Sequence, residues 1–201
     1  MTTQPQLLRQ SVSPRHGVDA LGRVMPEGSW PSNRQAPGSL ESVRRFLNTT
    51  NRESGAELLN SVAGVRSFAR REGFPLGTSI RSADVDRLLE LRELLHLAVV
   101  RRHIPRQLNE IARRSVVTMT LSPTVSFVVQ GNRVEPFVST IIVRVHQSMA
   151  DGTWNRLHAC SNKHCQWVVF DHSKNKSLRW CAEEACGFRD RARRRQKTLE
   201  A

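Results

Sequence analysis

The four cysteines of this chain are the feature that most constrains its fold. All four lie near the C-terminus, in the pattern Cys160-x4-Cys165-x15-Cys181-x4-Cys186. Two pairs of thiols separated by a loop are typical of a four-thiolate zinc site, because Zn²⁺ takes four ligands in a tetrahedron and two short turns can meet around one ion. The alternatives are two disulfides, four reduced structural thiols or an iron site.

The spacing within each cysteine pair indicates a turn. On a helix, residues i and i+5 point roughly 140° apart, so neither pair can converge on one ion from a continuous helix. Gly187, directly after Cys186, suits such a turn because glycine tolerates backbone angles that other residues avoid. The module around the cysteines contains few apolar residues, so we expect metal binding and folding to be one event.

The N-terminal residues bear on the cellular compartment. Disulfides require an oxidising compartment, yet residues 1–30 contain no uninterrupted apolar stretch of the kind that a secretory signal carries. The chain also lacks an apolar run of about 18 residues, the minimum for a membrane-spanning helix. We therefore expect a cytoplasmic protein with no membrane partner.

The charge is strongly basic and unevenly distributed. The chain has 31 Lys and Arg against 18 Asp and Glu, a net charge of +13. Residues 156–201 contain 11 basic and 5 acidic side chains, and the densest basic run is 189–197. A basic segment joined to a zinc module predicts a polyanionic partner, most often nucleic acid, although a basic tail can also be simply solvated.

Residues 1–38 contain five of the nine prolines and almost no apolar periodicity, which predicts a flexible leader. The following region, 39–150, has helical periodicity broken by a β-branched segment, and its clearest helix carries an apolar stripe from Val85 to Val99. A strand is an alternative over the β-branched run 141–143. We expect helices over 39–47, 56–71, 82–103, 107–114 and 136–150, and strands over 116–121 and 124–129.

The cysteine module resembles the CGNR zinc-finger family. The resemblance is carried by Cys160-Ser-Asn-Lys-His-Cys165, Trp167, Phe170-Asp171, Ser173, Trp180-Cys181 and Cys186-Gly187-Phe188-Arg189. Phe188 stands where the family has Asn, which leaves the four thiols intact. Upstream, Phe46-Leu-Asn48-Thr49 and the segment 89–94 are similar to the ABATE domain, which usually precedes this finger. The resemblance implies a bacterial transcription regulator linked to stress.

These patterns and the resemblance predict an α+β chain. We expect a mainly helical, ABATE-like regulatory domain over 39–150, with a small β-hairpin or sheet. It is followed over 156–199 by a small treble-clef-like or knuckle-type zinc finger. The finger ends in a basic helix that begins at about Cys186.

The predicted metal ligands are Cys160, Cys165, Cys181 and Cys186, holding a structural Zn²⁺. Four thiolates complete the tetrahedron, which favours structure over catalysis, and no nucleophile motif, phosphate loop or pair of carboxylates indicates an enzyme. The candidate nucleic-acid contacts lie in the loop between the cysteine pairs and in the basic helix: Lys174, Lys176, Arg179, Arg189, Arg191, Arg193, Arg194, Arg195 and Lys197.

The leading hypothesis is a transcription regulator that binds double-stranded DNA. An RNA-binding zinc module and a protein-interaction adaptor are the alternatives. We expect the helical domain to act through a homodimer, a small anionic ligand or the transcription machinery. Arg92, with Asn48 and Thr49, is the candidate ligand pocket, and an internally paired Arg92 is the alternative.

Overall fold

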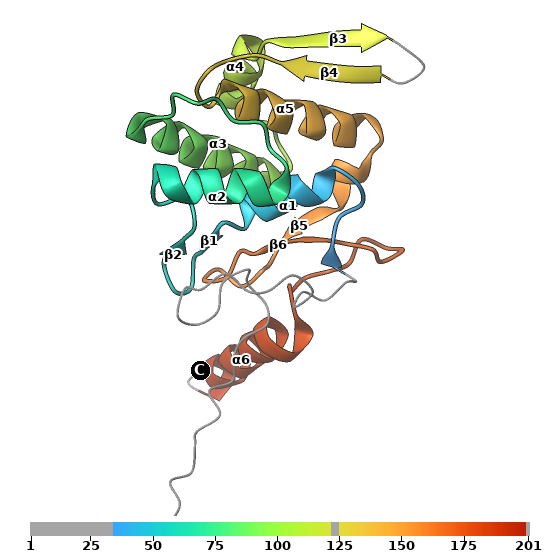
Figure 1. Cartoon of the computed structure of the whole chain (residues 1–201). Helices are drawn as coiled ribbons and strands as arrows, with labels where there is room; N and C mark the ends of the chain where they lie inside the picture. Colours follow the sequence, from blue (N-terminus) through green and yellow to red (C-terminus); the bar gives the residue numbers. More distant parts are fainter. Residues whose placement is uncertain (1–33, 122–124, 200–201) are drawn as a thin grey trace, which may run out of the picture.

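The computed structural model describes residues 34–121 and 125–199 (Figure 1). Most of the expected leader, 1–38, lies outside this part of the chain. Its described end is held in place: Ala36 is buried, and its backbone N–H donates to Glu41 Oε2 at 2.8 Å. The His172 ring also donates from Nε2 to the Gln35 carbonyl, at 2.8 Å.

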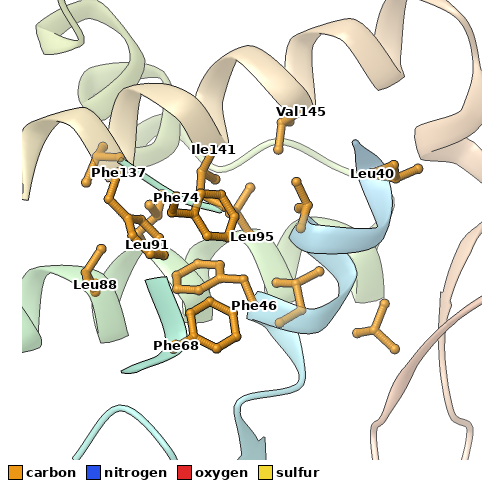
Figure 2. Packing of buried hydrophobic residues seen from close by; sticks show 14 of the residues in the cluster. Leu40, Phe46, Phe68, Phe74, Leu88, Leu91, Leu95, Phe137, Ile141 and Val145 are labelled. Carbon is orange, nitrogen blue, oxygen red and sulfur yellow. The ribbon is translucent and has the colours of Figure 1, made fainter. Parts of the chain in front are cut away.

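Helices form the body of the molecule, and aromatic rings fill the space between them (Figure 2). The Phe74 and Phe137 rings stack with centroids 4.3 Å apart, and Phe46 lies 5.4 Å from Phe137. These residues come from separate segments, so their burial joins the helices into one core. The helices are α1 (Leu40–Leu47), α2 (Val62–Glu72), α3 (Ser82–Arg101), α4 (Arg106–Arg114) and α5 (Glu135–Ala150).

Local sequence explains several helix ends. Ser61 caps α2 by accepting a hydrogen bond on its Oγ from the Gly64 N–H, and Gly73 ends this helix with a φ of 67°. Pro136 lies in the first turn of α5, where its missing N–H costs nothing. Among the described residues, no helix is long and apolar enough to cross a membrane.

The strands form three separate antiparallel pairs. They are β1 (Thr50–Asn51) with β2 (Ala56–Glu57), β3 (Val117–Leu121) with β4 (Val125–Val129), and β5 (Leu157–Ala159) with β6 (Val168–Phe170). The β3–β4 hairpin projects from the helical body, and the C-terminal helix α6 (Phe188–Leu199) lies at the opposite end of the molecule (Figure 1). The predicted α+β class, mainly helical with small strand pairs, is confirmed.

Two sequence-based expectations for secondary structure are corrected. The second helix begins at Val62 and not at Ala56, because 50–57 folds into the β1–β2 pair, with Asn51 Oδ1 accepting hydrogen bonds from two N–H groups of its turn. The strand alternative for 141–143 is wrong, since α5 is helical throughout. Packing of Ile141 against the core outweighs its β-propensity.

The β5–β6 pair serves two cores. Val168 and Phe170 join the core of the helices, whereas Trp167 and Val169 pack among the cysteines. This alternation follows from the period of two in a strand. The pair therefore completes the helical core on one face and the cysteine cluster on the other.

A side chain of the helical body pairs with β6 as a neighbouring strand would. The Asn48 amide donates from Nδ2 to the Val168 carbonyl at 2.7 Å and accepts on Oδ1 from the Val168 N–H at 2.9 Å. Arg44 donates to the same carbonyl at 3.2 Å. All three residues are buried, so these bonds satisfy backbone groups that water does not reach.

Asn48→Ala should destabilise the whole protein. It leaves the Val168 N–H without its acceptor in a buried place, which typically costs about 1–3 kcal/mol of unfolding free energy. Denaturant unfolding of the zinc-loaded chain measures this loss. Asn109→Ala, at an exposed site on α4, is the matched control and should change the free energy by less than about 0.5 kcal/mol. Equal effects of the two substitutions would contradict the role given to Asn48.

Candidate metal centre

The first cysteine pair lies on a tight turn between two strands. Cys160 follows the last residue of β5, and its N–H donates to the Trp167 carbonyl at 2.9 Å. The Asn162 carbonyl accepts from the N–H of both Cys165 and Gln166, at 2.9 and 3.0 Å. Gln166 adopts a left-handed φ of 49°, which turns the chain back into β6. The turn brings both thiols to one side.

The second pair lies around one wide helical turn. Cys181 precedes a π-helical turn, Glu183–Gly187, which contains Cys186, and the Cys186 N–H donates to the Ala182 carbonyl at 3.0 Å. Gly187 does not have the left-handed φ that favours glycine. A Cβ at this position would lie 2.9 Å from the Glu183 carboxylate, which is exposed and would have to shift.

The four sulfur atoms form a compact, buried cluster. All lie within 4.8 Å of one another, with 3.6 Å between Cys165 and Cys181 and 3.7 Å between Cys181 and Cys186. A tetrahedral zinc site with Zn–S bonds of about 2.3 Å places its sulfurs roughly 3.8 Å apart. A disulfide needs about 2.05 Å, and the four cysteines are free. The geometry therefore fits a four-thiolate zinc site.

The thiols influence one another strongly. The Cys160, Cys181 and Cys186 thiols, together with burial, raise the pKa of Cys165. The Cys160, Cys165 and Cys181 thiols, joined by the Asn162 amide, lower the pKa of Cys186. Such a cluster cannot ionise fully unless a cation neutralises it, and bound Zn²⁺ deprotonates its thiol ligands. Protons therefore compete with the metal, and zinc affinity should fall as the pH falls.

Asn162 connects the metal ligands to the basic helix. It is buried, and its Nδ2 donates to Cys186 Sγ at 3.5 Å. Its Oδ1 accepts from the His164 N–H at 3.2 Å and lies 3.5 Å from Arg193 Nη1. Asn162 was not predicted from the sequence to have a role at the site. Its only sequence signal is its position between Cys160 and Cys165, since the contacts with Cys186 and Arg193 come from folding.

The basic helix α6 begins at Phe188, directly after the π-helical turn that contains Cys186, close to the expected start at about Cys186. Three of its cations have acidic partners: Arg189 pairs with Glu53, Arg191 pairs with Glu183, and Arg194 Nε lies 2.9 Å from Asp190 Oδ2. Among the described side chains, Arg195 has no such partner and is exposed. Lys197 belongs to α6, and its side chain lies outside the described part.

The loop candidates are exposed to solvent. Lys174 and Lys176 lie in the loop that precedes Cys181, and Arg179 places its guanidinium 5.0 Å from the centre of the Trp180 ring. The loop is held by Asp171, whose carboxylate accepts hydrogen bonds from the N–H of Ser173 and of Leu178. These cations therefore project from a loop with a defined shape.

The candidate ligand pocket is filled by internal contacts. Arg92 Nη1 lies 2.7 Å from Glu57 Oε2 and donates to Thr49 Oγ1 at 2.9 Å, and the Arg92 Nε lies 3.1 Å from Glu93. Asn48, the third residue of the predicted pocket, is engaged with Val168. These contacts favour the internally paired alternative for Arg92, and an anionic ligand at this place stays a prediction.

Cys181→Ser should remove the zinc and destabilise the chain. A serine hydroxyl is a poor zinc ligand, and the remaining thiols lose the cation that neutralises them. Elemental analysis should give one zinc per wild-type chain and a several-fold lower content in the variant. Because β5–β6 also belongs to the helical core, thermal unfolding of the variant should begin at a lower temperature. Ser177→Ala, at an exposed site in the same module, is the control. Iron in the wild-type protein, or full zinc occupancy in Cys181→Ser, would contradict the assignment.

Two family models match the chain in consecutive regions. Residues 156–197 match the model described as the CGNR zinc finger. Residues 42–133 match the ABATE model, described as "Putative stress-induced transcription regulator". A search among curated proteins finds no match. The chain thus matches the ABATE model and then the CGNR zinc-finger model, in the order that the resemblance predicted, and the four clustered cysteines, which could bind a zinc ion, lie in the region that matches the finger.

Proposed function

We propose that the protein is a cytoplasmic transcription regulator that binds double-stranded DNA through α6 and the adjacent zinc-finger loop. The observation that carries this proposal is the position of α6. The helix follows the last zinc ligand and extends away from the helical body (Figure 1), with Arg191, Arg194 and Arg195 exposed. A basic helix that projects from a rigid base can approach a duplex without rearrangement of the core.

The two sides of α6 have different surroundings. Arg189 pairs with Glu53, and the Nη1 of Arg193, an exposed residue, lies 3.5 Å from Asn162 Oδ1. Arg191 and Arg195, about 40° apart on a helical wheel, lie on the other side. The zinc holds the turn that precedes α6, and Asn162 links this turn to Arg193. The inner side thus positions the helix and the outer side supplies phosphate contacts.

The ion pairs of α6 do not prevent such contacts. The Arg191–Glu183 pair is exposed, and exposed pairs contribute only about 0–1 kcal/mol. A DNA phosphate can therefore replace Glu183 at small cost, whereas Asp190, the partner of Arg194, is half-buried. Lys174, Lys176 and Arg179 add positive charge on the neighbouring loop. The helical domain, whose 16 basic and 11 acidic residues between 39 and 155 are less concentrated, has the regulatory role.

Replacing Arg191 and Arg195 together by Ala should weaken DNA binding and reduce its salt dependence. If about five phosphates are neutralised, a plot of log affinity against log salt concentration should have a slope near −4 to −5. Loss of two contacts should make the slope shallower by about 1–2. The measurement is fluorescence anisotropy of a labelled duplex with the zinc-loaded chain at several salt concentrations.

The control removes the same charge from another surface. Arg70 and Arg106 are exposed on α2 and α4, so their replacement by Ala lowers the net charge equally without touching the finger. This variant should retain the wild-type slope. Competition of single-stranded RNA with the labelled duplex tests the RNA-binding alternative. If the chain binds a partner protein equally well after the α6 charges are removed, the adaptor alternative is favoured. Salt-insensitive binding, or equal losses in both double variants, would contradict the proposal.

A further inference from the structure

A cavity lies where the end of α3 meets the metal-binding turn. Its volume is about 330 Å³, and Val99 and Val100 of α3 line it together with Arg102, which directly follows this helix. The remaining lining residues come from β5 and the turn after it, and they include His158, Ser161 and Lys163. Sites for small molecules have volumes of about 300 Å³ and above, so this cavity suits a small ligand.

The charged groups that line this cavity are all basic. Arg102 and Lys163 are cations, His158 can become one, and no carboxylate is among the lining residues. Within the described parts of the chain, no carboxylate forms an ion pair with Arg102 or Lys163. Arg92, in contrast, is already paired with Glu57. An anion can therefore enter this cavity without breaking an internal ion pair, which it cannot do at Arg92.

The hydrogen-bond donors of the cavity suit a phosphate group. Arg102 Nη1 donates to the Asn155 carbonyl at 3.1 Å, which positions the guanidinium and leaves its other N–H groups for a ligand. Lys163 is exposed and adds an ammonium group, and Ser161 adds a hydroxyl. A guanidinium and an ammonium group together can bind several phosphate oxygens through charge-assisted hydrogen bonds. Val100, which is 46% exposed, offers apolar surface for a short carbon chain on the phosphate.

The backbone is in an uncommon conformation at two places in the cavity wall. Three non-glycine residues of the described chain have a left-handed φ, and two of them line this cavity: Arg102, with a φ of 55°, and Gln166, with a φ of 49°. Directly after a helix, this conformation is usually adopted by glycine, because a Cβ disfavours it. An arginine at a position that suits glycine points to a role for its side chain.

From these observations we propose that the cavity binds the phosphate group of a small phosphomonoester, and that Arg102 and Lys163 contact this phosphate. The ligand touches the end of α3 and the metal-binding turn at once, so it connects the helical body to the cysteine module. Because it binds only the folded chain, it stabilises both parts together. The phosphates of DNA have the same chemistry, but the concave wall favours the compact end of a small molecule. The site does not depend on DNA binding by α6.

A phosphorus NMR titration of the full, zinc-loaded chain with ethyl phosphate tests the site, at about 0.15 M salt to screen weak surface attraction. The wild-type chain should bind the probe saturably, with a Kd below about 5 mM. The temperature of thermal unfolding should rise with the concentration of ethyl phosphate, and ethanol, which lacks the phosphate, should not raise it.

Arg102→Gly with Lys163→Gln should bind ethyl phosphate at least about tenfold more weakly. Glycine fits the left-handed φ and Lys163 is exposed, so without the probe this variant should unfold at a temperature no lower than that of the wild type. The control, Arg101→Gln with Lys174→Gln, also removes one arginine and one lysine, both exposed and outside the cavity. Its affinity for the probe should stay within about twofold of the wild type.

The proposal is overturned if the wild-type chain shows no saturable binding up to about 20 mM ethyl phosphate. A site variant that binds like the wild type, or a control that loses as much affinity, also overturns it. If the site variant loses as much affinity for duplex DNA as for ethyl phosphate, the two cations serve the DNA backbone and the proposal is wrong. DNA binding is measured by the anisotropy of the duplex and depends on α6, so failure of one proposal leaves the other open to its own test.

Discussion

The β5–β6 pair is the element on which the rest of the structure depends, because its alternate residues belong to two different cores. Leu157, Val168 and Phe170 pack with the helices, while Trp167 and Val169 pack with the cysteines. A change in the metal site therefore acts directly on the helical core. The zinc module is better regarded as part of a continuous structure than as an independent finger on a linker.

Polar contacts reinforce this connection. The Asn48 amide is hydrogen-bonded to both the N–H and the carbonyl of Val168. His96 of α3 donates from Nε2 to the Gln166 carbonyl at 2.9 Å. Burial lowers the pKa of His96, which keeps the ring neutral and able to make this bond near neutral pH. Since Gln166 directly follows Cys165, the helical body contacts the metal-binding turn at its most constrained point.

The two ends of the molecule differ in charge. One end carries α6 and the loop cations, and the other carries an uncharged hairpin. On α6, Arg189 pairs with Glu53 and the exposed Arg193 contacts Asn162, so these two cations of the basic run also hold the helix against the rest of the chain. The position of the helix comes from the zinc-bound turn and Asn162, because exposed ion pairs hold a helix only weakly.

Local patterns in the sequence determined the pairing of the four cysteines around turns, the apolar stripe of α3 and the strand character of β3 and β4, because spacing and periodicity are properties of short segments. They failed where a distant contact decides the outcome. Leu58 and Leu59 extend the helical pattern of α2 toward the N-terminus. The helix nevertheless begins at Val62, because the residues just before Leu58 pair as β2 with β1. Gly187 was correctly placed in a turn, but its φ is not left-handed and the turn does not use the freedom that glycine offers. Asn48, Asn162 and Arg92 act through partners 120, 24 and 35 residues away. Tertiary structure alone brings those partners together, since burial of the shared core, and no local preference, sets their positions.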